Sequence, residues 1–166
     1  MKKNRFIFIF VILLFTIGCS SKEDILLDTK EATANAFESG PKGVNIEQKH
    51  FAYYMPDTMN QDSIQEHNVI LMEGKQTYIL FVNTLEPKDS QAVYESTYSD
   101  QEYELHETFK KDEQFGFVKV LEMDDSRYEI IVGIGGVKLT TVTKLNKVAS
   151  SAEKMMVIAN SVRYKP

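Results

Sequence analysis

The fold is decided by residues 127–162, which read RYEIIVGIGGVKLTTVTKLNKVASSAEKMMVIANSV. Residues 127–145 are rich in β-branched and apolar side chains around glycines at 133–136, which predicts strands interrupted by a turn or bulge. Residues 150–153, Ser-Ser-Ala-Glu, then have the form of a helix capping box. An apolar helical face follows, formed by Ala152, Met155, Met156, Ile158, Ala159 and Val162. We therefore expect a C-terminal helix that packs on a sheet.

Upstream of this segment, five more runs have the composition of strands. They are residues 49–55, 68–72, 77–85, 103–110 and 115–123. The second and third runs flank Glu73-Gly74-Lys75-Gln76 and predict an antiparallel hairpin. A short helix is expected at 92–98, with Asp89 or Ser90 as its N-cap. The expected fold class is α+β: an antiparallel sheet of about six strands, one helix after the third strand, and a C-terminal helix on the sheet.

The amino terminus has the three parts of a secretory signal peptide. Residues 1–5 are short and basic, residues 6–17 are apolar apart from Thr16, and Gly18-Cys19 follows at once. The apolar run is about 12 residues long, whereas a membrane-spanning helix needs about 20. Residues 16–19, Thr-Ile-Gly-Cys, resemble the lipobox of bacterial lipoproteins, although Thr16 stands where leucine is commonest.

The lipobox resemblance implies a lipid anchor at Cys19. In lipoproteins of this kind a diacylglyceryl group joins the cysteine sulfur, cleavage follows the preceding residue, here Gly18, and the new amino terminus takes a further acyl chain such as palmitate. Two or more acyl chains hold a protein on a bilayer far better than one. We expect the mature protein on the extracytoplasmic face of the cell membrane. The alternative is an ordinary secretory signal with an incidental cysteine.

Three segments are expected along the chain. Residues 1–18 are the signal peptide, residues 19–43 are the lipidated anchor and tether, and residues 44–166 form a single α+β domain. Within the tether, residues 23–39 contain good helix formers and precede the stop signal Gly40-Pro41. That stretch is expected to be either a short helix or a flexible spacer.

The composition argues against several kinds of partner. The chain has 19 Lys and Arg against 24 Asp and Glu, and removal of Lys2, Lys3 and Arg5 with the signal peptide leaves 16 against 24, a formal charge of −8. Such a charge repels phosphates, so neither nucleic acid nor anionic lipid headgroups are expected as partners on net charge alone. Whether basic side chains gather into a local patch depends on the tertiary structure and not on the net charge.

The expected element order resembles the Mog1/PsbP-type α/β/α sandwich. The resemblance spans about residues 44–164 and is carried by Phe-Ala-Tyr-Tyr-Met-Pro at 51–56 and Met-Val-Ile-Ala-Asn-Ser-Val at 156–162. It implies a binding or assembly factor rather than an enzyme, because members of that fold group are mostly such factors. No catalytic motif is transferred by the resemblance.

No group of residues predicts a catalytic, cofactor or metal site. His50, His67 and His106 lack the spacing of metal ligands, and the single cysteine rules out an internal disulfide or a thiolate cluster. Asp124-Asp125-Ser126 has the composition of a solvated turn rather than a calcium loop. Gly133–Gly136 lacks the spacing of a phosphate-binding loop. We therefore expect no metal and no cofactor.

Aromatic side chains are the remaining clue to function. Exposed tyrosines suit a protein interface because they bring a large rigid surface at a low entropy cost. We expect a binding surface that includes Tyr53, Tyr54, Tyr78 and Tyr128, and the alternative for these residues is core packing. The function expected is that of a non-enzymatic, membrane-anchored binding or assembly module for an envelope protein or a ligand.

Two other functions stay open at this point. One is a cell-envelope hydrolase that uses a histidine or paired carboxylates as acid and base, such as Glu102 with Glu104 or Glu129 with Asp125. The other is a lipoprotein whose role is mainly structural.

Overall fold

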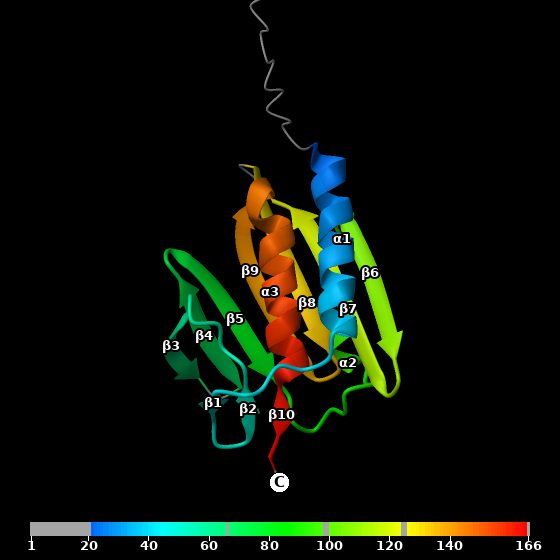
Figure 1. Ribbon diagram of the computed structural model, residues 1–166. Helices are drawn as coiled ribbons and strands as arrows, with labels where there is room; N and C mark the ends of the chain where they lie inside the picture. The colour runs from blue at the N-terminus through cyan, green and yellow to red at the C-terminus, as the bar shows by residue number, and fades with distance from the viewer. Residues whose placement is uncertain (1–20, 66, 98–99, 124–125, 166) are drawn as a thin grey trace, which may run out of the picture.

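A seven-stranded antiparallel sheet forms the middle layer of the protein (Figure 1). The computed structural model describes residues 21–65, 67–97, 100–123 and 126–165. In spatial order the strands are β3 (Asn60–Gln65), β4 (Asn68–Glu73), β5 (Gln76–Val82), β9 (Val137–Lys144), β8 (Arg127–Ile134), β7 (Gln114–Glu122) and β6 (Leu105–Lys111). The expected α+β class is confirmed, as is the β4–β5 hairpin, and the main sheet has seven strands where about six were expected.

Two helices, α1 (Lys22–Glu38) and α3 (Val148–Ser161), lie side by side on one face of this sheet (Figure 1). The short helix α2 (Ala92–Glu95) follows β5, and its Val93 packs with Phe115 and Phe117 of β7 on the opposite face. In the described ranges, no helix combines the length and the apolar run needed to cross a membrane.

A second, three-stranded sheet lies at the end of the molecule where α3 finishes (Figure 1). Its strands are β1 (Ile46–Glu47), β2 (Phe51–Tyr53) and β10 (Arg163–Tyr164), with β2 in the middle. The aromatic run expected as a strand of the main sheet is therefore shorter than predicted, and it pairs with these two strands instead.

The hairpin β8–β9 provides the central strands under α3. Alternate residues point toward the helices, so Ile130 and Val132 of β8 and Leu139 of β9 are buried against Met155 and the rest of the core. Gly135-Gly136 makes the two-residue turn between the strands. Gly135 has φ 52, and a Cβ there would lie 2.3 Å from the Pro87 carbonyl oxygen. The turn thus depends on glycine both for its backbone conformation and for the close approach of the segment after β5.

Helix α1 belongs to the packed fold. Its four buried residues are Thr29, Thr33, Ala36 and Phe37. Phe37 lies against Gly116 of β7, where a Cβ would come within 2.8 Å of its ring. Asn160 of α3 donates hydrogen bonds to the carbonyl oxygens of Ala36 and Phe37, at 3.3 and 3.0 Å. Of the two expectations for residues 23–39, the structure shows the helix, and it shows that this helix covers the sheet rather than acting as a spacer.

The capping box predicted at Ser150–Glu153 is wrong. Helix α3 begins at Val148 with Lys147 as N-cap, and no side chain caps it. A 3-10 turn at Leu145–Lys147 leads directly into the helix, so Ser150 lies inside the first turn of α3 and not at its start. The Ser150 hydroxyl donates instead to the Lys147 carbonyl oxygen at 3.3 Å.

A capping box is present at α1, where the sequence did not predict one. The Ser21 hydroxyl accepts from the Asp24 amide at 3.1 Å, and the Asp24 carboxylate accepts from the Ser21 amide at the same distance. The N-cap predicted for α2 is also displaced, from Asp89 or Ser90 to Gln91, whose side chain makes no capping bond. The Ser90 hydroxyl accepts from the amide of Ala92, the first residue of the helix.

Replacing Phe37 by alanine tests whether α1 stabilises the fold. Since its ring is 1% exposed, we expect Phe37→Ala to lower the free energy of unfolding by about 3–5 kcal/mol. Leu27 on the same helix is 56% exposed, so Leu27→Ala should change it by less than about 0.5 kcal/mol. Urea titration of the full chain in mild detergent, followed by circular dichroism, measures both. Equal effects of the two variants would mean that α1 does not contribute to the core.

Candidate binding site

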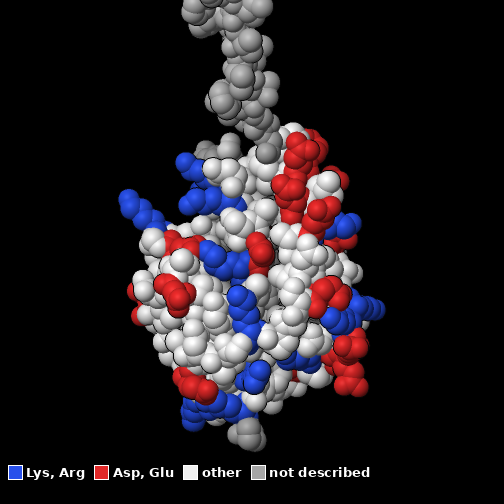
Figure 2. Space-filling view, viewed as in Figure 1, with Lys and Arg blue, Asp and Glu red and all other residues white. Residues whose placement is uncertain are grey.

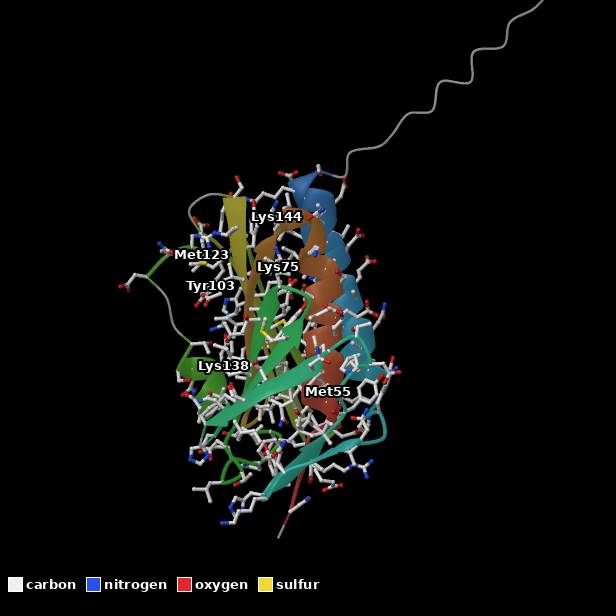
Figure 3. All side chains as sticks on the ribbon, turned by 90° about the vertical axis from the view of Figure 1, so that its left-hand side faces the viewer. Met55, Lys75, Tyr103, Met123, Lys138 and Lys144 are labelled. Atoms are coloured by element: carbon white, nitrogen blue, oxygen red, sulfur yellow. The ribbon has the colours of Figure 1, made fainter. Side chains whose placement is uncertain are left out.

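The face of the sheet opposite α1 and α3 is only partly covered (Figure 3). Over β6 and β7, helix α2 closes a small hydrophobic cluster of Val93, Phe115 and Phe117. The cluster also packs against Phe81 of β5 and Ile131 of β8, and beyond these two residues no described element covers the same face of β4, β5, β9 and β8. Ile79 of β5 and Val142 of β9 are consequently 42% and 38% exposed there.

We call this uncovered surface the open face. It consists of Ile70, Met72, Thr77, Ile79, Thr140 and Val142, all half-buried or exposed. Phe81 and Ile131, which pack against the α2 cluster, border it. Strand register brings several of them into one row, because Ile79 lies opposite Ile70 on one side and Thr140 on the other. A shallow depression of about 370 Å³ is lined by Ile79, Thr140 and Val142 together with Glu129 and Lys75.

The same row continues from Ile131 to Lys119 of β7 and His106 of β6. Lys119 is 4% exposed. Its ammonium donates to the Thr97 hydroxyl at 2.9 Å and to the carbonyl oxygens of Thr97 and Tyr94, each at 3.3 Å. It also lies 4.3 Å from the centre of the Tyr94 ring and 5.2 Å from that of Tyr103. Lys119 thus ties the α2 segment to the sheet, and no described carboxylate forms an ion pair with it.

A pocket of about 600 Å³ lies beside Lys119. It is lined by Tyr94, Glu95, Gln101, Glu102, Tyr103, His106 and Lys119. The Tyr94 hydroxyl and His106 Nε2 are 2.8 Å apart and share a hydrogen bond. Burial lowers the pKa of Lys119. Burial, and then the charge of Lys119, also hold the pKa of His106 below 6.5, although Glu107 acts in the opposite direction.

Three of the four tyrosines expected at a binding surface lie in the core. Tyr53, Tyr78 and Tyr128 are 0%, 1% and 3% exposed, so the prediction is wrong for them and the core-packing alternative holds. Tyr78 and Tyr128 are on the helix side of their strands, and burial raises the pKa of both Tyr53 and Tyr78 to about 12. Tyr54 is half-buried, with the Lys42 ammonium 5.3 Å from its ring centre.

The other residues singled out in the sequence do not converge. Among the described residues no three His, Cys, Asp or Glu side chains are placed to hold a metal ion. Glu104 is engaged with Lys22 at 2.8 Å, whereas Glu102 lines the Lys119 pocket. Cys19, Asp124 and Asp125 lie outside the described residues, so their predicted roles stay predictions.

Sequence reasoning missed the open face and Lys119. The alternation in β5 and β9 separates the two faces of each strand, yet it does not tell which face stays uncovered. A lysine within a β-branched strand, as at Lys119, was the available signal for a buried cation.

Comparison of the sequence with known protein families finds no match, and a search of curated proteins finds none either.

Two charge changes beside His106 test the electrostatics of the pocket. Lys119→Met should raise the pKa of His106 toward 6.5, because a positive charge is removed. Glu107→Gln should lower it further, because the carboxylate that favours protonation is lost. NMR titration of the imidazole measures both, and shifts of the two variants in the same direction would contradict this account.

The lowered pKa of His106 also has a consequence for stability. The folded protein binds this proton less readily than the unfolded chain, so the His106 contribution to the free energy of unfolding falls as the pH drops through 6.5 and below. Lys119→Met should weaken that dependence.

Proposed function

We propose that this chain is a lipoprotein anchored through Cys19 on the extracytoplasmic face of the cell membrane, where it acts as a non-enzymatic binding or assembly module for another envelope protein. The observation that carries the proposal is the open face. One side of the sheet is covered by two helices, whereas Ile79 and Val142 on the other side are left in contact with water.

The composition of the open face suits a partner that binds and leaves. Covering apolar surface contributes about 25 cal/mol per Å², so a partner laid across Ile70, Ile79 and Val142 would be held by the hydrophobic effect. Thr77 and Thr140 dilute the apolar surface and keep the free protein soluble. Glu129, Lys75 and Lys138 supply charges around it, as the polar rim of a protein interface does.

The position of the proposed anchor favours a partner close to the membrane. The α1 cap residue Ser21 follows Cys19 by two residues, which span about 7 Å at most. Acyl chains on Cys19 would therefore hold the packed domain directly at the bilayer surface. A partner that reaches the open face would be an envelope protein in or next to the same membrane.

Two further points support a binding role over the hydrolase alternative. The groups best suited to acid–base chemistry near the pocket, His106 and Lys119, are bonded to Tyr94 and Thr97 and hold the α2 segment in place. The resemblance to the Mog1/PsbP-type sandwich, whose members are mostly binding or assembly factors, points the same way and stays a prediction.

Cys19→Ser tests the anchor. Since a hydroxyl cannot take the place of the thioether sulfur, the variant should lose partition into the detergent phase, and cleavage after Gly18 should stop. Mass spectrometry of the amino terminus and detergent phase separation measure these two results. Ser20→Ala, one position further, is the matched control and should behave as the unchanged protein. Unaltered processing and partition of Cys19→Ser would refute the anchor.

Site-specific photo-crosslinking in native membranes tests the open face. A photoreactive side chain at Ile79 or Val142 should give the same discrete adduct with one envelope protein. The same probe at Leu85, which is 90% exposed and outside the open face, should give none. Ile79→Lys should remove the adduct formed from position 142, because a buried charge would oppose binding. Equal labelling from position 85 would mean that the open face is not the binding surface.

A further inference from the structure

Four basic side chains gather at one end of the molecule, and we call them the basic cluster: Lys75, Arg127, Lys144 and Lys147. They come from the β4–β5 turn, the start of β8, the end of β9 and the 3-10 turn before α3. Together they line a surface pocket of about 510 Å³, and all four are exposed. Figure 3 shows Lys144 and Lys75 on the upper part of the molecule, with Lys138 at the far end of β9.

The charges of the basic cluster are not neutralised within the described residues. The ion pairs there use five other lysines, namely Lys22, Lys30, Lys111, Lys154 and Lys165. Glu73, the carboxylate among the residues that line the pocket, is paired with Lys154 and accepts from the Thr58 hydroxyl. The pocket is thus left with a net positive charge.

Two features of the backbone make these charges unfavourable in the free protein. Arg127 and Lys144 lie directly opposite each other on β8 and β9, and like charges in that relation destabilise a sheet. Lys147 is the N-cap of the 14-residue helix α3, whose positive dipole end favours an anion. A bound anion would relieve both repulsions.

The basic cluster is at the end of the fold where the chain enters it. Lys22, in the first turn of α1, bonds to Glu122 of β7 at 2.7 Å. The Tyr128 hydroxyl donates to the same carboxylate at 3.0 Å, and Tyr128 adjoins Arg127. Figure 2 shows side chains of both signs of charge at this end. Basic side chains lie at the upper left, and acidic ones lie over the upper part of α1. The cluster therefore shares its end of the molecule with Ser21, two residues after Cys19.

We infer that the basic cluster contacts the phosphates of anionic lipid headgroups and so fixes the orientation of the anchored domain relative to the membrane. The inference rests on the proposed lipid anchor. Acyl chains on Cys19 would keep this end of the domain near the charged surface, where the field is felt over about 8 Å at physiological ionic strength. The first turn of α1 brings the carboxylates of Glu23 and Asp24 toward the same surface, and the cluster offsets their repulsion.

The contact is tested with the full lipidated protein reconstituted in vesicles. A fluorophore is attached at a cysteine placed by Asn146→Cys, between Lys144 and Lys147, where the acylated Cys19 sulfur does not compete for the label. Quenching by a headgroup-labelled lipid then reports docking in phosphatidylcholine with about one quarter phosphatidylglycerol, and in phosphatidylcholine alone. We expect quenching in the anionic vesicles that is lost at high salt and is absent from the neutral ones.

Charge reversal provides the matched variants. Each basic residue near an anionic surface strengthens binding about fivefold, so Lys144→Glu with Lys147→Glu should lower the docking equilibrium constant by at least about 25-fold. Lys49→Glu with Lys110→Glu makes the same change of net charge outside both the basic cluster and the open face, and should leave docking nearly unchanged. Both pairs are exposed or half-buried without ion pairs in the described residues, and circular dichroism verifies that each variant is folded.

The outcomes separate this inference from the proposed function. A protein that fails to associate with either kind of vesicle lacks the anchor, which overturns the proposed function and this inference with it. A protein that associates equally with both, with equal quenching at position 146 and no effect of salt or charge reversal, is anchored but has no headgroup contact. Displacement by millimolar inorganic phosphate at constant ionic strength would assign the cluster to a soluble phosphate instead, and would also refute the inference.

Discussion

The packing of α3 on the β8–β9 hairpin is the contact on which the rest of the structure depends. Met155, Met156 and Ile158 are fully buried, in one core cluster with residues of the sheet and with Ala36 and Phe37 of α1. The same helix fixes its neighbours through polar groups at its end: Asn160 bonds to the last turn of α1, and the Ser161 hydroxyl accepts from the Tyr54 amide at 2.8 Å. One amphipathic helix thereby positions the other helix and the small sheet.

The two faces of the main sheet follow from this packing. One face is occupied by α1 and α3, so only the short α2 segment is left to cover the other. That segment is held by Lys119, whose buried ammonium bonds to Thr97 and Tyr94, and its cluster extends only to Phe81 of β5 and Ile131 of β8. The open face is what remains, and its exposed Ile79 and Val142 are the reason for proposing a protein partner.

The two ends of the sheet also differ. The end near Ser21 carries the basic cluster, whereas the small sheet of β1, β2 and β10 closes the opposite end. The formal charge of −8 expected after removal of residues 1–18 argues against an interaction with anionic headgroups. Net charge does not describe a local surface, because screening limits each charge to its surroundings and the four basic residues line one pocket.

The sequence by itself determined the features that depend on neighbours along the chain. The alternation around Gly74 and Gly135 and the helical spacing from Ala152 to Val162 are local, and the hairpins and α3 are found where expected. The lipobox resemblance at Cys19 is likewise a local pattern. Only the tertiary structure decided that Tyr53, Tyr78 and Tyr128 are core residues, and that Lys75, Arg127, Lys144 and Lys147 meet. Burial and clustering depend on which elements cover which face, and that is set by packing between residues far apart in sequence.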